Sequence, residues 1–391
     1  MQIFCLMPWS NSPGSSRYAC LHMDMKSIKR VKTPSSILVI ITRRIGDVLL
    51  TTPMIRSLRL AWPEARIDAL VFVGTESVLA SNPDLNQIIT VSQRPTLYQH
   101  LRLLLRLWRS YDLALSMMPS DRPTMYAFIA GKHRVGLILT GGKHLWKKWL
   151  LSQSVEFDNI HTHTVLMNLK LADLLGVPRC HEVVAAWHAA DEVAVRKILP
   201  FNLENQAYAV LHVYPMYAYK AWRSEGWVEL AEWLSGQKIK VVLTGGKSAD
   251  EMAYVHRLMG LLPRDTVDTV GNLNLASVAY LLSKARAYVG PDTVVTHLAA
   301  ASGTPTVALF GPSNPVKWGP WPKGYNEDRN PYEMRGTQRV NNVVLLQGGG
   351  DCVPCMEEGC ERHIASLSDC LQNLSATKVI NEMRELISLP H

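Results

Sequence analysis

The segment Arg44-Ile-Gly-Asp47-Val-Leu-Leu-Thr-Thr-Pro53 joins the end of an apolar run to the start of a helical pattern. Two roles therefore compete for Asp47. Aspartate is a favoured helix N-cap, because its carboxylate accepts hydrogen bonds from the first free N–H groups and complements the helix dipole. A carboxylate at the mouth of a cleft can instead serve as a general base that takes a proton from a hydroxyl group. Taken alone, a Gly-Asp turn favours the capping role.

A second loop, Gly290-Pro-Asp292-Thr293-Val-Val-Thr-His297, follows another apolar run and also opens a helix. Free N–H groups at the helix start, together with the Thr293 hydroxyl, form a natural anion site, although Asp292 can also be a simple cap. His297 lies about one turn further on and faces either a cleft or the core. A tight turn at Phe310–Pro315 follows the next strand, and two such turns on adjacent strands fit a diphosphate better than one cap does.

Two more loops carry the charges that a nucleotide requires. Lys220 follows the first strand of the second half and can neutralise a phosphate as a point charge, unless it is an ordinary solvated lysine. In Thr244-Gly-Gly246-Lys-Ser-Ala-Asp250-Glu251 the glycines allow close backbone approach, and Asp250 or Glu251 can accept hydrogen bonds from ribose hydroxyls. These loops together predict a site for a nucleoside diphosphate.

The cysteines are gathered near the C-terminal end. Cys352, Cys355, Cys360 and Cys370 begin with the C-x2-C spacing of metal ligands, but the later spacings do not repeat it. A structural zinc site or a redox-sensitive pair is one interpretation, and structural thiols are the other. The total of seven cysteines is odd and no export signal is recognisable, which argues against a secreted disulfide scaffold and favours a cytoplasmic protein.

The elements that must position these loops alternate between apolar runs and helical patterns, which is typical of βαβ units in parallel sheets. We expect an α/β protein with two doubly wound halves facing a central cleft, because ligands of such sheets bind beyond the carboxyl ends of the strands. The predicted boundaries are a disordered or mis-started tail at 1–34, an N-terminal domain at 35–195 and a C-terminal domain at 205–391, with a Cys-rich segment at 352–370. The expected strands are 37–42, 67–73, 87–91, 112–117, 133–137, 207–213, 240–244, 267–270, 287–289 and 306–310, and the expected helices are 52–62, 97–109, 164–175, 225–234, 250–261, 275–283, 294–301 and 376–388.

Composition excludes several classes. The 391 residues are 47% hydrophobic and 19% charged, which allows real cores. Half of the net charge of +8 lies before residue 35, so the remainder is too weakly basic for a dedicated nucleic-acid binder. No apolar run reaches the roughly 18–20 residues that cross a bilayer. The dinucleotide and P-loop signatures are both missing. Basic, apolar stretches at 97–109 and 141–150 are either ordinary amphipathic helices or a face for peripheral membrane contact.

Arg44-Ile-Gly-Asp47-Val-Leu-Leu-Thr-Thr-Pro, Lys220-Ala-Trp, Leu243-Thr-Gly-Gly and Gly290-Pro-Asp-Thr-Val-Val-Thr-His297 together resemble glycosyltransferase family 9, the ADP-heptose:lipopolysaccharide heptosyltransferases. The likeness runs from about residue 37 to residue 322. It implies a GT-B fold with two Rossmann-like domains, in which the C-terminal domain binds most of the donor. It also implies inverting, metal-independent transfer of heptose from ADP-heptose to the lipid-linked inner core of lipopolysaccharide, with no cofactor.

The resemblance assigns a role to each matching residue. Asp47 matches the family's proposed catalytic base, and Lys220 matches its phosphate-binding lysine. The remaining donor-side matches are Asp292, Thr293 and His297, with Asp250 or Glu251 at the ribose, and the acceptor-side matches are Arg44, Asp121 and Arg122. A transferase of the same fold with another nucleotide sugar, or a non-catalytic nucleotide-sugar-binding protein, is the alternative.

Overall fold

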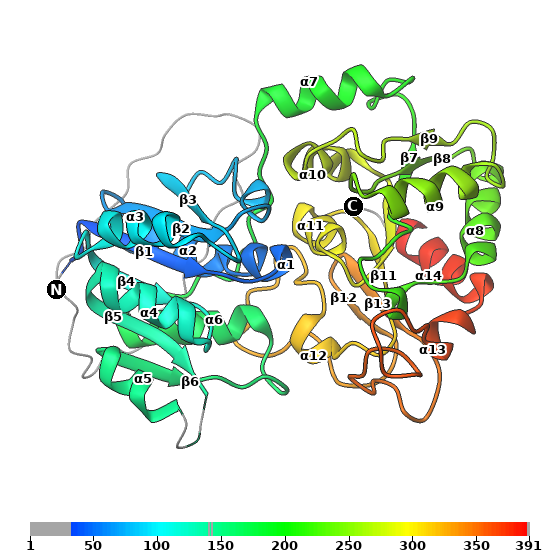
Figure 1. Ribbon diagram of the computed structural model, residues 1–391. Coiled ribbons are helices and arrows are strands. Elements are labelled where there is room, and N and C mark those ends of the chain that lie inside the picture. Colours follow the sequence, from blue (N-terminus) through cyan, green and yellow to red (C-terminus); the bar gives the residue numbers. More distant parts are fainter. Residues whose placement is uncertain (1–32, 140, 142–143, 389–391) are drawn as a thin grey trace, which may run out of the picture.

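The computed structural model describes residues 33–139, 141 and 144–388. The predicted tail at 1–34 therefore lies outside the described residues except for its last two. The described strands form a six-stranded sheet of order β3-β2-β1-β4-β5-β6 and a seven-stranded sheet of order β12-β13-β11-β10-β7-β8-β9. Each sheet is covered by helices, and the two halves face each other through α1 (Ile45–Leu49) and α11 (Val294–Ser302) (Figure 1). The predicted GT-B architecture of two doubly wound parallel-sheet domains is confirmed.

The N-terminal sheet is parallel throughout, and its apolar runs are buried on both faces. Side chains of a strand alternate between the two faces. In β1, Ile37 and Val39 pack on the side of α2 and α6, whereas Leu38 and Ile40 pack on the side of α3 and α4. The elements are β1 (Ser36–Ile41), α2 (Thr52–Ala61), β2 (Arg66–Phe72), β3 (Gln87–Val91), α3 (Leu97–Leu107), β4 (Tyr111–Ser116), α4 (Asp121–Ala130), β5 (Gly131–Ile138), α5 (Leu145–Leu150), β6 (Gln153–Glu156) and α6 (Thr164–Leu175).

The C-terminal sheet is parallel except for its edge strand, β12, which runs antiparallel to β13. Ala209 and Leu211 of β7 pack toward α8 and α14, and Tyr208 and Val210 pack toward α10 and α11. The last helix therefore belongs to this half. The elements are α7 (Ala189–Ile198), β7 (Tyr208–Leu211), α8 (Ser224–Gly236), β8 (Lys240–Leu243), α9 (Ala249–Met259), β9 (Val267–Asp268), α10 (Leu275–Lys284), β10 (Ala287–Pro291), β11 (Thr306–Phe310), α12 (Pro315–Trp318), β12 (Gln338–Val340), β13 (Val343–Gln347), α13 (Asp369–Gln372) and α14 (Ala376–Ser388).

Several predicted bounds are confirmed to the residue, namely those of β3, α6, β11 and α14. Helix α6 ends at Gly176, whose φ of 65° is the left-handed conformation that glycine adopts without steric cost. Helix α7 was not expected; it packs against α10, so the chain has already reached the second half by Ala189. Strands β6, β12 and β13 were also not predicted, although β13 is an apolar, fully buried run.

Polar contacts join the two halves beside the α1–α11 contact. The ring of His163 hydrogen-bonds the Gly319 carbonyl at 2.8 Å, the Thr164 hydroxyl donates to the Lys317 carbonyl at 3.0 Å, and Asn314 donates to the Ile160 carbonyl at 2.9 Å. The segment before α6 is thereby fastened to α12 of the other half.

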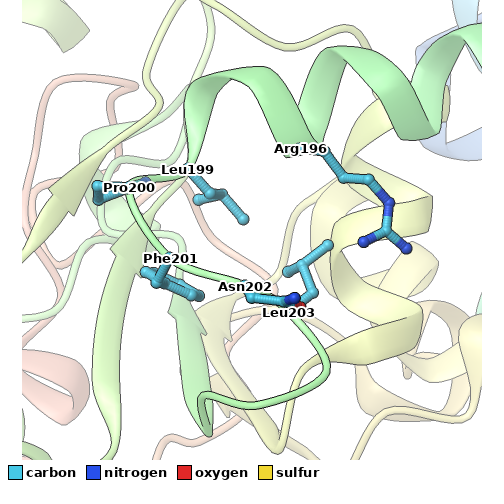
Figure 2. A pocket seen from close by; sticks show the side chains of 6 residues that line it. All are labelled: Arg196, Leu199, Pro200, Phe201, Asn202 and Leu203. Carbon is cyan, nitrogen blue, oxygen red and sulfur yellow. The ribbon is translucent and has the colours of Figure 1, made fainter.

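A surface pocket of about 410 Å³ lies where the chain leaves α7 and enters β7 (Figure 2). It is lined by Arg196, Leu199, Pro200, Phe201, Asn202 and Leu203. The pocket therefore lies at the amino end of β7. The loops singled out in the sequence lie at the opposite, carboxyl ends of the strands, so this pocket is not part of their site.

Candidate functional site

Asp47 lies at the interface of the two halves. It sits in the first turn of α1, directly after β1, and its side chain is only 6% exposed. A Cβ on the neighbouring Gly46 would lie 3.9 Å from Cδ2 of His297 in the other half, so α1 and α11 are in close contact. Asp47 does not cap α1: Arg44 occupies the N-cap position, and Oδ1 of Asp47 is buried with no hydrogen-bond partner.

The charge of Asp47 is only partly compensated. Burial raises the pKa of Asp47 to about 6, although the cations of Arg43, Arg44 and Lys317 oppose that rise. The nearest cation is the guanidinium of Arg43, with Nε 3.5 Å from Oδ2. A buried carboxylate with a free oxygen and a pKa near neutrality has the properties of a general base, because it is ionised at pH 7 and still gains from accepting a proton.

In the other half, Asp292, Lys220 and His297 form one cluster. Asp292 follows β10 and Lys220 follows β7, which is the neighbouring strand, while His297 lies on α11. Nζ of Lys220 donates to Oδ2 of Asp292 at 2.5 Å, and Nε2 of His297 lies 3.9 Å from Oδ1 of the same carboxylate. Three of the predicted donor-side residues are thus brought together beside the contact between α1 and α11.

The protonation states within this cluster follow from burial and charge. Burial acts to raise the pKa of Asp292, but the Lys220 ammonium and the other polar groups around the carboxylate together hold that pKa below its usual range. Burial lowers the pKa of His297 to about 4, despite the carboxylate of Asp292. His297 is therefore neutral at pH 7. Its Nδ1 is buried and has no hydrogen-bond partner.

The predicted anion site at the start of α11 has the expected backbone. Thr293 is the N-cap residue, and its side chain makes no capping hydrogen bond. Ser313, from the turn after the adjacent strand β11, helps to lower the pKa of Asp292. The first N–H groups of α11 thus remain available to an anion beside the second tight turn, and the Thr293 hydroxyl lies 3.5 Å from that of Thr296.

The structure separates the two carboxylates at the start of α9. Asp250 is exposed, whereas Glu251 is buried beneath the glycine turn, where a Cβ on Gly246 would lie 3.0 Å from Oε2. Burial raises the pKa of Glu251, opposed by a hydrogen bond from the backbone of Gly246. Glu251 therefore lies against the loop that closes over this strand end, and Asp250 points to solvent.

The acceptor-side residues lie on two separate elements. The guanidinium of Arg44 stacks over Tyr217 of the other half, 5.0 Å from the ring centroid. Asp121 is exposed and forms an ion pair with Lys147 at 2.7 Å. Arg122 donates to the Gln93 carbonyl at 2.9 Å and lies over Phe72. Arg44 therefore borders the donor half, while Asp121 and Arg122 begin α4 at the carboxyl end of β4.

Two site residues were missed in the sequence, Lys317 and His163. Nζ of Lys317 donates to the Asp158 carbonyl at 2.8 Å and lies 4.3 Å from the centroid of Phe157. Burial lowers the pKa of Lys317 to about 8, against the influence of Asp158 and Asp47. Burial also lowers the pKa of His163 to about 3, so its fully buried ring is neutral. Both residues come into the site only through contact between the halves, which no local pattern reveals.

The loop of Lys220 is held by the C-terminal segment. The hydroxyl of Ser368 donates to the Tyr219 carbonyl at 2.7 Å, Gln372 donates to the Ala221 carbonyl at 2.8 Å, and the indole of Trp222 donates to the Leu374 carbonyl at 2.8 Å. Residues 368–374 therefore fix the backbone on both sides of Lys220.

The four C-terminal cysteines are free thiols. Cys352, Cys355 and Cys360 are exposed and Cys370 is half-buried, with the Asp369 N–H donating to Cys360 at 3.3 Å. Burial, followed by the neighbouring cysteines, raises the pKa of Cys370 to about 11. Over the described part of the chain, no three His, Cys, Asp or Glu side chains lie close enough together to hold a metal ion. The zinc interpretation therefore gains no support from this arrangement.

Comparison with known proteins gives consistent matches. The family model "Glycosyltransferase family 9 (heptosyltransferase)" matches residues 100–344. Lipopolysaccharide heptosyltransferase 3 of Escherichia coli K12 is 26% identical over 287 residues, covering 71% of this chain and 82% of that protein.

Two solved structures show the same fold. A glycosyl transferase of family 9 from Veillonella parvula aligns with a TM-score of 0.73 at 18% identity, covering 90% of this chain and 97% of that one. The ADP-heptose lipopolysaccharide heptosyltransferase II of E. coli aligns with a TM-score of 0.68 at 18% identity, covering 90% and 98%.

Proposed function

Because the chain belongs to glycosyltransferase family 9, and is therefore a glycosyltransferase, we propose that it moves heptose from ADP-heptose to the inner core of lipopolysaccharide with inversion at the anomeric carbon. The observation that carries this proposal is the position of Asp47. Asp47 of the first half is buried, one of its carboxylate oxygens has no hydrogen-bond partner, and it directly follows Gly46, which lies close to His297 of the His297–Asp292–Lys220 cluster of the second half.

In the proposed step, the acceptor hydroxyl attacks the anomeric carbon of heptose on the face opposite the diphosphate. A new C–O bond forms, the bond between the anomeric carbon and the phosphate oxygen breaks, and ADP leaves with the electron pair. The hydroxyl proton passes to the carboxylate of Asp47, whose pKa of about 6 lets it act as base at neutral pH.

The second half stabilises the leaving group. Negative charge develops on the diphosphate as the bond breaks, and Lys220 with the free N–H groups of α11 supplies positive charge there. The hydroxyl of Thr293 adds a donor, and Glu251 accepts hydrogen bonds from the ribose. We propose that this cationic and amide cradle makes a metal ion unnecessary, so that transfer persists in the presence of a chelator.

The catalytic cycle requires the halves to separate. With Asp47 only 6% exposed, an acceptor sugar cannot reach the carboxylate in the arrangement seen here. The contacts of His163, Thr164 and Asn314 across the interface are the ones that must break when substrates enter. Closure then excludes water, which competes with the acceptor. We place the enzyme in the cytoplasm, at the inner membrane, where its lipid-linked acceptor is exposed.

The deciding experiment measures donor turnover with a truncated lipopolysaccharide acceptor and a panel of ADP- and UDP-sugars, with and without EDTA. The proposal expects turnover with ADP-heptose alone, unchanged by EDTA, and a product of inverted anomeric configuration. Turnover with a UDP-sugar and not with ADP-heptose would assign another donor, and retention of configuration would remove Asp47 as the base.

A further inference from the structure

Helix α3 carries two apolar stripes. Leu103, Leu104 and Leu107 pack into the core beneath the N-terminal sheet. A second stripe points away from that core and consists of Leu97, Leu101, Leu105 and Trp108, at steps of four, four and three residues. Its members are exposed to solvent by 84%, 59%, 79% and 63%, in that order. A helix packed on a sheet needs only one apolar stripe, so the fold gives no reason for the second.

Basic side chains border this second stripe. Arg102, Arg106 and Arg109 each follow a member of the stripe by one residue, and all three are exposed. Between residues 85 and 155 the sequence contains ten lysines and arginines against two aspartates. Both aspartates are paired, Asp112 with Lys132 and Asp121 with Lys147. This excess of eight positive charges equals the net charge of the whole chain.

Helix α5 lies in the same helix layer as α3 and α4 and adds further exposed apolar and basic side chains to it. Helix α4 contacts α3 on one side and α5 on the other, so the three helices cover one face of the N-terminal sheet (Figure 1). On α5, Trp146 and Trp149 are exposed, the latter by 87%, and Lys148 lies exposed between them. The face formed by α3, α4 and α5 is therefore both apolar and strongly basic.

We propose that the α3–α4–α5 face docks on the surface of an anionic lipid bilayer. Exposed leucines and tryptophans flanked by arginines and lysines are the pattern of helices that lie in a membrane interface, with apolar side chains among the acyl chains and cations at the headgroups. A second copy of this chain does not fit, because it would set the exposed basic side chains of one copy, Arg102, Arg106, Arg109 and Lys148 among them, against the same side chains of the other. Nucleic acid would leave the leucines exposed.

This docking also serves the site, and to that extent the inference rests on the proposed function. Helix α4 begins at Asp121 and Arg122, at the carboxyl end of β4, where the acceptor is expected to bind. The docking face thus continues to the acceptor side of the interface between the halves. A lipid-linked acceptor would meet the enzyme there without leaving the membrane.

The test is co-sedimentation with vesicles, without donor or acceptor. Wild-type protein should bind vesicles of one part phosphatidylglycerol to three parts phosphatidylcholine, and bind pure phosphatidylcholine far less. Arg102→Gln with Arg106→Gln should weaken partition to the anionic vesicles about 30-fold, because each basic residue near such a surface contributes about fivefold. Leu101→Gln with Leu105→Gln should weaken it more than tenfold.

Matched controls lie on the other half of the molecule. Lys197→Gln with Lys378→Gln removes two exposed charges, and Val193→Gln with Leu261→Gln removes two exposed apolar side chains. Both should bind vesicles as wild type does. Retained binding in the α3 variants, equal losses in the controls, or absence of wild-type binding would overturn the inference. So would a wild-type dimer that Leu101→Gln with Leu105→Gln converts to a monomer.

A heptose-transfer assay with a delipidated core oligosaccharide tests the proposed function without membrane docking, because this acceptor has no lipid. All four variants should transfer at the wild-type rate, because none touches the site, and circular dichroism checks that they fold. Absence of wild-type transfer with every donor would refute the proposed function while leaving the vesicle result to decide the docking.

Discussion

Asp47→Asn tests the proposed base most directly, because the amide matches the carboxylate in shape but cannot take up the acceptor proton. Loss of a general base lowers the rate by about 10²–10⁴-fold. Transfer by the wild-type enzyme should itself fall tenfold per pH unit below about pH 6, where Asp47 becomes protonated. ADP binding should stay within about threefold, because the donor cradle belongs to the other half.

The same substitution has a predictable effect on stability. Burial raises the pKa of Asp47 from 3.8 to about 6, so the folded state disfavours the ionised carboxylate by about 3 kcal/mol. Since the folded pKa lies above the unfolded one, this cost is absent below pH 4, grows between pH 4 and 6, and is fully present at pH 8. Asp47→Asn should therefore raise the free energy of unfolding by up to about 3 kcal/mol at pH 8, and by less than about 1 kcal/mol at pH 4.

Urea denaturation at the two pH values and steady-state transfer assays measure both effects. Asp265→Asn is the control, because Asp265 forms an exposed ion pair with Lys240 far from the interface; it should leave transfer unchanged. A variant that keeps more than a tenth of the wild-type rate would refute the role of Asp47 as base. A variant that is less stable at pH 8 would refute the reasoning on its buried charge.

Three other substitutions probe the donor cradle and the interface. Lys220→Met should weaken ADP binding at least tenfold, as measured by calorimetric titration, and an unchanged ADP Kd would contradict the assigned contact. Because the substitution leaves Asp292 buried without its cation, it should also lower the free energy of unfolding by about 3 kcal/mol, as measured by urea denaturation. Glu251→Gln should weaken ADP binding about tenfold, whereas Asp250→Asn should not change it, because Glu251 is buried at the site and Asp250 is exposed. Equal effects of the two substitutions would refute the assignment of the ribose contact to Glu251. Lys317→Met should move the acid limb of the pH–rate profile to higher pH, because it removes a cation that favours the ionised base; an unmoved limb would show that the two charges are not coupled.

Local patterns in the sequence predicted most of the fold. Strand β11 and helix α6 were predicted to the residue, because an uninterrupted apolar run and a Gly-Val-Pro stop are strong local signals. Strand β6, with the sequence Gln-Ser-Val-Glu, has no such run, because it is half-buried at a sheet edge. The antiparallel edge strand β12 has only three residues and is also half-buried.

The site was predictable where its residues follow strands and not where they depend on contact between the halves. Lys220 and Asp292 follow neighbouring parallel strands, so the topology alone predicts that they meet. The N-cap interpretation of Asp47 was wrong for α1, because Arg44 takes that position. Lys317 reaches the site only when α12 docks on the segment before α6, a contact between residues 159 positions apart.

The three hydrogen bonds that fix the backbone around Lys220 have a consequence for synthesis. Their partners stand 149 to 152 positions further along the chain. At about 5–20 residues per second, a ribosome delivers those partners roughly 8–30 seconds after the lysine itself has emerged. Nascent protein must therefore pass through a period in which the β7 strand has been made but its phosphate-binding loop has no support, and capture of nucleotide should begin only after residues 368–374 have left the ribosome.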